Sequence, residues 1–348
     1  ASPAAQRERV AVSTLPWRQL RVESIARLEA AGIDDPGQEV RWIEERASGR
    51  STAELQAALD EPATVREVAF VDQMGARRAA GEPLQYVLGR WGFRTLDLMV
   101  DRRCLIPRPE TEVVAGLALD ALAARDRRVA GTPAAEGTPV AVDLGTGSGA
   151  IALSLAAERW PHVEVWATDA SADALAVARA NLAGLGRRAG VVRLVEGDWF
   201  EALPDELRGR VDVVVSNPPY VADGDELPPD VADWEPVGAL RAGPEGLDDI
   251  RRIVAGAPTW LTPGGVLVVE IGETQGDAVL ALARAAGFET ASVEPDLAGR
   301  PRALVAQVPE VGDEGPVPAV PSPTEPSALG DAPGASGMGW GRSEDQEP

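Results

Sequence analysis

Lysine is absent from this chain, and cysteine and histidine each occur once. A single cysteine, Cys104, cannot form an internal disulfide, and with His162 as the only histidine no Cys/His cluster has metal-ligand spacing. Because no general base can be paired with Cys104, we interpret it as a small buried hydrophobe and not as a nucleophile. We therefore expect no metal cofactor and a reducing, cytoplasmic setting.

Long hydrophobic runs are missing as well. No stretch reaches the roughly 18 apolar residues of a membrane-spanning helix, and the first residues lack a charged-then-apolar export signal, so we expect no membrane partner. The chain has 55 acidic and 33 basic residues, all of the latter arginine, and a net charge of −22. This charge disfavours a surface that wraps nucleic acid, although a local arginine patch could persist within it. We expect no direct nucleic-acid partner, and a monomer.

The 348 residues are enough for two domains with separate cores. Apolar residues at helical spacing precede short extended pieces around Trp91, and a regular alternation of strands and helices follows. Ser51 and Glu54 have the spacing of a helix capping box. The last forty residues are rich in Pro, Gly and acid, and cannot offset their ordering entropy by burial. We predict a helical bundle over residues 1–82, a β-hairpin linker over 83–108, a catalytic domain over 109–308 and a disordered tail over 309–348.

The alternation within residues 109–308 predicts an α/β fold. A helix over residues 112–124 comes first. Expected strands are residues 140–144, 163–168, 191–195, 211–215 and 265–271, and the helices between or after them are residues 150–159, 172–183, 247–260 and 274–286. This order predicts a parallel sheet with helices on both faces. The runs 288–293 and 302–308 suit an antiparallel pair at its edge, which makes seven strands.

The segment Ser216-Asn217-Pro218-Pro219-Tyr220 follows an apolar strand candidate. Its prolines fix φ and remove two backbone donors, which leaves carbonyl acceptors beside the Asn217 side chain. A planar NH₂ group could donate to Asn217 Oδ1 and the Pro218 carbonyl while Tyr220 covers one face. We predict that Asn217, Pro218, Pro219 and Tyr220 form a catalytic and substrate-binding site for amino-group methylation. The alternative is an ordinary Asn-Pro turn.

A glycine-rich turn lies at Gly145-Thr146-Gly147-Ser148-Gly149 between an expected strand and helix. Its Gly-x-Gly-x-Gly spacing differs from the dinucleotide fingerprint, and Asp143 just before it would repel phosphate and could hold an ammonium group. S-adenosylmethionine carries a sulfonium and an ammonium but no phosphate. We therefore predict that these five residues bind S-adenosylmethionine.

Further acids follow the next two strands. Asp169 could accept hydrogen bonds from both ribose hydroxyls, although it could instead cap a helix. Asp198 and Trp199 could bind an adenine edge and stack on its face. Because ligands of open α/β sheets lie at the carboxyl ends of strands, we predict that these residues and Asn217 share one cofactor site.

Together these residues mark a resemblance to the class I S-adenosylmethionine-dependent methyltransferases, and more closely to the protein-(glutamine-N5) methyltransferases of peptide chain release factors. The segments that carry it are 83–89, 106–112, 143–149, 197–200, 217–220 and 234–236. The resemblance implies a release-factor-binding helical bundle, a β-hairpin linker and a Rossmann-like seven-stranded catalytic domain. It also implies methylation of the glutamine in the factors' Gly-Gly-Gln motif. The lysine-free composition and the tail depart from the family, but neither touches the motif positions.

Two alternatives remain open. Asn-Pro-Pro-Tyr is shared with methyltransferases of adenine N6 and other exocyclic amines, so a nucleic-acid amine could be the substrate, against which the acidic composition counts. The other alternative is a binding module that has lost the reaction, and the intact glycine turn argues against it. The paired Glu110 and Glu112 resemble acid/base residues, but we expect them to position the linker and to cap a helix.

Overall fold

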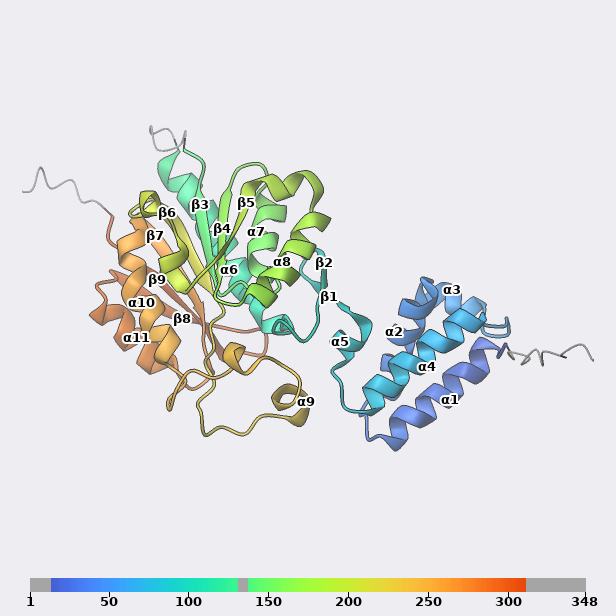
Figure 1. The fold of residues 1–348 in the computed structure, drawn as a ribbon. Coiled ribbons are helices and arrows are strands. Elements are labelled where there is room, and N and C mark those ends of the chain that lie inside the picture. Colours follow the sequence, from blue (N-terminus) through green and yellow to red (C-terminus); the bar gives the residue numbers. More distant parts are fainter. Residues whose placement is uncertain (1–13, 131–136, 311–348) are drawn as a thin grey trace, which may run out of the picture. The chain divides into compact units, whose positions relative to one another are not determined.

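The structure is a computed structural model that describes residues 14–130 and 137–310, so almost all of the predicted tail of residues 309–348 lies outside the described residues. A seven-stranded sheet organises the larger part of the chain, with strand order β5-β4-β3-β6-β7-β9-β8 (Figure 1). Its strands are β3 (Val140–Leu144), β4 (Glu164–Asp169), β5 (Val192–Glu196), β6 (Val211–Ser216), β7 (Leu261–Glu270), β8 (Thr290–Pro295) and β9 (Pro301–Gln307).

The strands from β3 to β7 are parallel to one another, whereas β9 pairs antiparallel with both β7 and β8. This confirms the α/β fold and the antiparallel edge pair. Strand β7 begins at Leu261, earlier than predicted, and its register against β6 shifts between Val211 and Val213. The carboxyl ends of the five parallel strands meet at one edge of the sheet, as the sequence predicted for the site.

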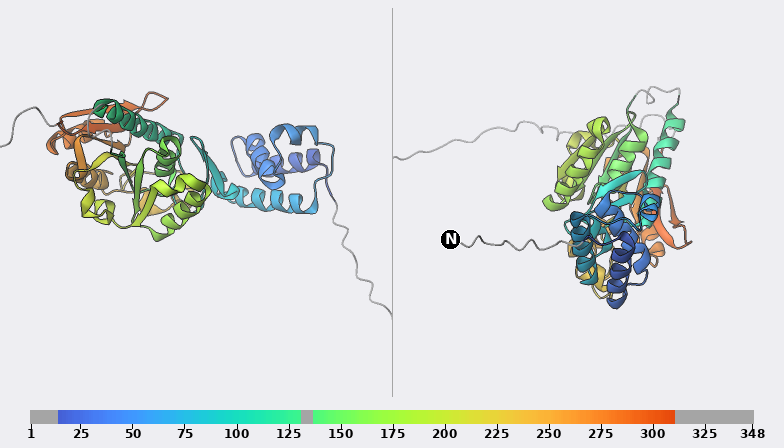
Figure 2. Two further views of the ribbon diagram at one scale, coloured as in Figure 1. Left: turned by 90° about the horizontal axis from the view of Figure 1, so that it is seen from above. Right: turned by 90° about the vertical axis from the view of Figure 1, so that its right-hand side faces the viewer.

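Helices cover both faces of the sheet (Figure 2). Buried strand residues alternate between the faces: Val142 and Val214 pack into one cluster with residues of α10 and α11, while Ala141 and Val213 pack into another with residues of α6 and α7. These helices are α6 (Pro109–Val129), α7 (Ala150–Arg159), α10 (Asp248–Trp260) and α11 (Gly276–Ala285), and α8 (Ala172–Gly184) packs along β4 and β5. The sheet is therefore the middle of three layers.

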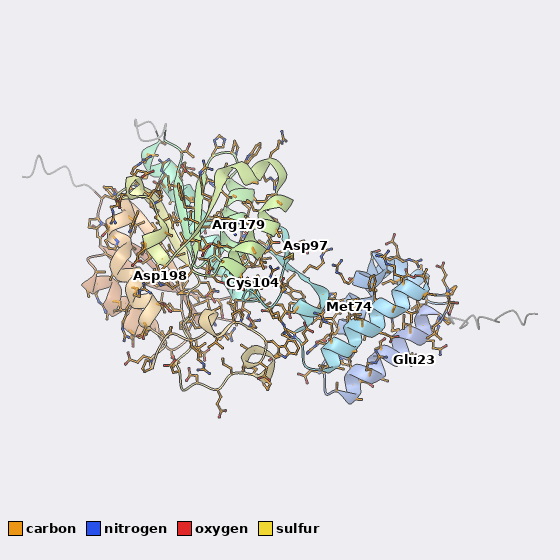
Figure 3. The ribbon with its side chains drawn as sticks, viewed as in Figure 1. Glu23, Met74, Asp97, Cys104, Arg179 and Asp198 are labelled. Atoms are coloured by element: carbon orange, nitrogen blue, oxygen red, sulfur yellow. The ribbon has the colours of Figure 1, made fainter. Side chains whose placement is uncertain are left out.

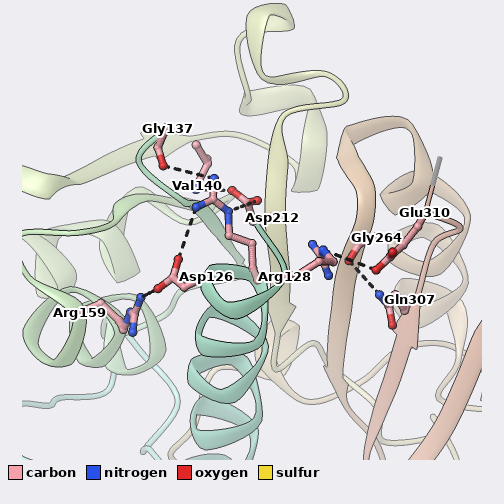
Figure 4. Close-up of polar contacts among 10 residues, drawn as sticks. Asp126, Arg128, Gly137, Val140, Arg159, Asp212, Gly264, Gln307 and Glu310 are labelled. Atoms are coloured by element: carbon pink, nitrogen blue, oxygen red, sulfur yellow. Dashed lines mark hydrogen bonds and ion pairs between the residues drawn. The ribbon is translucent and has the colours of Figure 1, made fainter. Parts of the chain in front are cut away.

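Buried ion pairs tie the amino-terminal edge of the sheet to α6 (Figure 4). Arg125 Nε donates to Asp212 Oδ1 at 3.0 Å, and the other oxygen of Asp212 accepts from Val140 N at 2.9 Å. Arg125 and Asp212 are both buried, so removing Arg125 would leave the Asp212 charge without its ion pair, whereas Arg125 also pairs with Asp126. This network lies at the end of the strands opposite the site.

Four helices near the start of the chain pack around a core that includes Trp17, Leu28 and Ile43, and the segment Leu84–Leu88 contributes to the same core. They are α1 (Trp17–Ala30), α2 (Pro36–Ser48), α3 (Thr52–Ala57) and α4 (Val65–Ala79). The predicted capping box of Ser51 and Glu54 is confirmed at the start of α3. No helix within the described ranges is both long and apolar enough to cross a membrane.

The linker region begins with a helix, which the prediction of a β-hairpin linker over residues 83–108 did not include. Helix α5 (Leu84–Leu88) precedes the hairpin of β1 (Arg90–Phe93) and β2 (Leu96–Met99). Pro83 directly precedes the helix, and Gly89, with φ 68°, ends it, as a left-handed glycine commonly does. The remaining short elements are α9 (Pro229–Ala232) and the 3₁₀ turns η2 (Gly186–Val191), η3 (Trp199–Ala202), η4 (Asp205–Leu207) and η5 (Val237–Ala239).

Candidate active site

A cavity of about 510 Å³ opens at the carboxyl ends of the parallel strands, a volume typical of small-molecule sites. Most of the predicted site residues line it: Gly145, Thr146, Gly147, Ser148, Asp169, Asp198, Trp199, Asn217 and Pro219. Gly149, Pro218 and Tyr220 are not among the lining residues. Residues of the linker segment complete the wall, among them Cys104, which Figure 3 labels together with Asp198.

The glycine turn follows β3 and is held by backbone contacts to β4. Thr146 N donates to Thr168 O at 2.9 Å, and Gly147 N donates to Asp169 Oδ2 at 2.8 Å. Gly145 has a φ of 70°, and a Cβ there would lie 3.1 Å from the Trp199 ring. A glycine is therefore required at 145 for two reasons, backbone conformation and contact with the indole.

Asp143 lies behind this turn and does not line the cavity, so the expectation that it could hold the cofactor's ammonium group is not met. Its Oδ2 accepts from the Thr146 hydroxyl at 2.7 Å and from Ala152 N at 3.0 Å. The side chain is 1% exposed, and burial raises its pKa to about 7. Asp143 thus joins the turn to the first residues of α7.

Asp169 ends β4 and faces the cavity. Its Oδ1 accepts from Ser171 N and its Oδ2 from Gly147 N, each at 2.8 Å. The helix-cap alternative is wrong for Asp169, because the Ser171 hydroxyl caps α8 by accepting from Ala174 N. Burial raises the pKa of Asp169. Each of its oxygens keeps a second lone pair, so the carboxylate can still accept a ligand's hydroxyl groups.

Trp199 has an unusual backbone conformation, with a φ of 46°. Its carbonyl accepts from the Thr168 hydroxyl at 3.2 Å, and its ring lies against Gly145. Burial raises the pKa of Asp249, a lining residue that sequence reasoning missed. Asp198 pairs with Arg252 at the exposed side of the cavity. The indole is therefore fixed against the glycine turn, while the carboxylate of Asp198 stays accessible.

Asn217 directly follows β6, and its Nδ2 donates to Thr111 Oγ1 of α6 at 3.0 Å. The Tyr220 hydroxyl donates to Glu270 Oε1 at the end of β7, at 3.2 Å. Burial raises the pKa of Glu270 to about 7, and it also raises the pKa of Tyr220. Sequence reasoning missed Thr111 and Glu270 as parts of the site. Glu270 did carry a signal, since it is an acid at the carboxyl end of a strand, as Asp169 is.

A side-chain amide supports the backbone just after the two prolines. Gln275 Nε2 donates to Tyr220 O at 3.1 Å and to Gly246 O at 3.0 Å. Gly246 has a φ of 67°, and a Cβ there would lie 2.2 Å from Tyr220 O. The loop through Gly246 therefore packs directly on the Asn-Pro-Pro-Tyr backbone, and no side chain fits between them.

The linker segment is attached to the site by two carboxylates. Glu235, which is 4% exposed, accepts from Ile106 N at 3.1 Å and pairs with Arg108. Glu112 Oε1 accepts from Arg94 N in the hairpin turn at 3.0 Å, as expected for a residue that positions the linker. The expected capping role is wrong, because α6 begins after Arg108 with no side-chain cap.

Cys104 is 2% exposed, and burial raises its pKa to about 11. A thiol in this state is not ionised at neutral pH and is a poor nucleophile. Its interpretation as a small buried hydrophobe is confirmed.

The strand order, the glycine turn and the Asn-Pro-Pro-Tyr segment define the larger part of the chain as an α/β methyltransferase. Two family models match: "PrmC N-terminal domain" over residues 19–89 and "Methyltransferase small domain" over residues 133–232. Among solved structures, the hMettl16 catalytic domain in complex with an RNA hairpin is similar, with a TM-score of 0.48 and 19% identity over 72% of this chain and 84% of that chain.

Curated relatives are more similar in sequence. The release factor glutamine methyltransferase of Cereibacter sphaeroides is 42% identical over 82% of this chain and 96% of its own length. That of Bordetella pertussis is 43% identical over 77% of this chain and 94% of its own length. The chain belongs to the release factor glutamine methyltransferase family, whose members are S-adenosylmethionine-dependent protein-glutamine methyltransferases.

Proposed function

We propose that this protein transfers a methyl group from S-adenosylmethionine to the side-chain amide nitrogen (N5) of the glutamine in the Gly-Gly-Gln motif of peptide chain release factors, and thereby modulates translation termination. The observation that carries the proposal is the orientation of Asn217. Its nitrogen end is committed to Thr111, so its oxygen is available at the cavity beside the glycine turn. An acceptor there suits an NH₂ group as the methyl acceptor.

The cavity has features that fit S-adenosylmethionine. Glycines in the turn after β3 allow a ligand to approach the backbone, Asp169 can accept the ribose hydroxyls, and Asp198 and Trp199 can bind the adenine edge and face. Such a cofactor supplies an electrophilic methyl group. The acidic residues of the site also suit a ligand that carries positive charge and no phosphate.

The nucleophile needs to be held and polarised, because the lone pair of a primary amide nitrogen is delocalised into the carbonyl. We infer that Asn217 Oδ1 and the Pro218 carbonyl accept its two N–H hydrogens, which increases the electron density on nitrogen. Orientation of bound reactants can lower a barrier by about 7–11 kcal/mol. The methylated amide then loses its extra proton to water, so no strong general base is required.

The substrate is tested by incubating the protein with labelled S-adenosylmethionine and, in separate reactions, unmethylated release factor, total RNA and DNA. We expect label on the factor, and its loss when the glutamine of Gly-Gly-Gln is changed to alanine. Label on RNA or DNA with an unmodified factor would instead favour a nucleic-acid amine methyltransferase. We further propose that the helices within residues 1–82 bind the factor and that residues 83–108 link them to a catalytic domain over residues 109–308.

A further inference from the structure

The amide of Asn217 can be placed in two ways that differ by a half-turn about its last side-chain bond. One end is a donor and the other is an acceptor, so a half-turn would present an N–H to the methyl acceptor instead of Oδ1. The bond from Nδ2 to Thr111 Oγ1, at 3.0 Å, joins residues 106 positions apart and favours the first placement.

The Thr111 hydroxyl can serve as that acceptor only if its own hydrogen points elsewhere. The neighbouring carboxylate of Glu270 is 1% exposed, and Thr111 lowers its pKa as a hydrogen-bond donor does. Among the residues that the structure describes, Glu270 Oε2 has no partner within hydrogen-bonding geometry. No bond from Thr111 to Glu270 meets that geometry in the structure, and the Thr111 hydroxyl is the group that could turn toward the unpartnered Oε2.

Tyr220 fixes the other side of the carboxylate. Its hydroxyl donates to Glu270 Oε1 at 3.2 Å. An ionised carboxylate accepts and does not donate, so the Tyr220 hydrogen points toward Glu270, and the Thr111 hydrogen would do the same on approach to Oε2. A lone pair of the Thr111 hydroxyl then faces Asn217. The charge of Glu270 therefore sets the direction of each hydrogen bond in this series.

We propose that Thr111 and Glu270 are positioning residues that keep Asn217 Oδ1 turned toward the methyl acceptor. The proposal deepens the proposed function and rests on it. Neither residue makes or breaks a bond in the reaction, because both act through the orientation of the Asn217 amide.

Protonation of Glu270 would reverse the chain of hydrogen bonds. Burial raises the pKa of this carboxyl to about 7, with Arg302 of β9 favouring the charged form and Glu110 of α6 opposing it. A protonated Glu270 can donate to Thr111, whose hydrogen then turns toward Asn217 and selects the half-turned amide. Methyl transfer should therefore decline as the pH falls below about 7.

The first test compares Thr111→Val with Thr111→Ser in single-turnover methyl transfer to release factor. Valine keeps the volume and removes the hydroxyl, so we expect transfer to slow about tenfold, the value of one hydrogen bond. Serine restores the hydroxyl and should return the rate to near wild type. Ser154→Ala is the matched control, because it removes a buried hydroxyl bond within α7, away from Asn217. Equal rates for Thr111→Val and wild type would overturn the proposal.

The pH profile separates positioning from general damage. Methyl transfer by wild type should decline below about pH 7. Thr111→Val should not show this acid-side decline, or limb, because Glu270 can no longer act on Asn217. A limb that persists unchanged in Thr111→Val would contradict the proposal and point to Asp143, whose pKa is also raised to about 7.

A spectroscopic measurement tests the proposal even if the factor is not the substrate. The side-chain NH₂ signals of Asn217 can be assigned in a nitrogen-15 spectrum by their loss in Asn217→Asp. We expect one of the two protons to be shifted by its bond to Thr111 in wild type and Thr111→Ser, and this shift to vanish in Thr111→Val. Identical signals in all three proteins would refute the positioning role. Absence of methylation by wild type would refute the proposed function alone.

Discussion

Replacing Gly246 by alanine tests whether the backbone after the two prolines must be held in place for catalysis. Two effects are expected. A left-handed backbone costs an alanine about 1–2 kcal/mol relative to glycine. In addition, the new Cβ would lie 2.2 Å from Tyr220 O, whereas ordinary contact begins at 3.4 Å, so the carbonyl must move by more than 1 Å.

The displacement has a cost of its own. Moving Tyr220 O breaks its bond from Gln275, worth about 0.5–1.5 kcal/mol, so we expect a total loss of stability of about 2–3 kcal/mol. A misplacement of about 1 Å at a site can lower a rate by about 100-fold. Gly209 provides a matched control: its φ is 68°, but a Cβ there meets nothing within 4 Å. Gly209→Ala should lose only the stability that the left-handed backbone costs an alanine, about 1–2 kcal/mol, and should keep full activity.

Urea unfolding and single-turnover methyl transfer measure the two effects. We expect Gly246→Ala to be about 1 kcal/mol less stable than Gly209→Ala and at least tenfold slower in transfer. Equal stability and equal rates in the two variants would refute the claim that this loop positions the Asn-Pro-Pro-Tyr segment.

Three further predictions concern single residues of the site. Asn217→Ala should slow methyl transfer at least about 100-fold while cofactor affinity stays within about tenfold, and transfer at near wild-type rate in single turnover would rule out its role. Asp169→Ala should weaken S-adenosylmethionine binding in calorimetry, and an unchanged dissociation constant would refute the ribose contact. Because burial raises the pKa of Asp143 to about 7, the folded protein holds a proton between about pH 4 and 7 that the unfolded chain has lost. Stability should therefore fall as the pH rises through this range, and Asp143→Asn should flatten the dependence in urea unfolding; an unaltered pH profile would contradict the assignment.

Local signals predicted much of the sheet. The strand at Val140–Leu144 and the helix at Ala150–Arg159 have the predicted bounds. Apolar runs, glycines and prolines determine the secondary structure of the residues next to them, so such bounds can be predicted from the sequence. The helix at Leu84–Leu88 was missed although Pro83 and Gly89 mark its ends. Five residues are too short for hydrophobic periodicity to be visible, so only the end signals could have identified it.

Contacts between distant residues could not be predicted. Thr111 meets Asn217 across 106 positions and Glu270 meets Tyr220 across 50, and nothing in either segment alone indicates its partner. Asp143 is the opposite case. Its position in the sequence suggested a ligand contact, but whether a carboxylate before a glycine turn faces the cavity or the core depends on the packing of the following helix.

Mapping the modified site by mass spectrometry tests the central claim most directly. Unmethylated release factor is incubated with the protein and S-adenosylmethionine, digested and sequenced by fragmentation. We predict a single added methyl group on the glutamine of Gly-Gly-Gln, located on its side chain and absent when Asn217→Ala replaces wild type. A methyl group on any other residue, or an unmodified factor in a reaction that consumes the donor, would contradict the account.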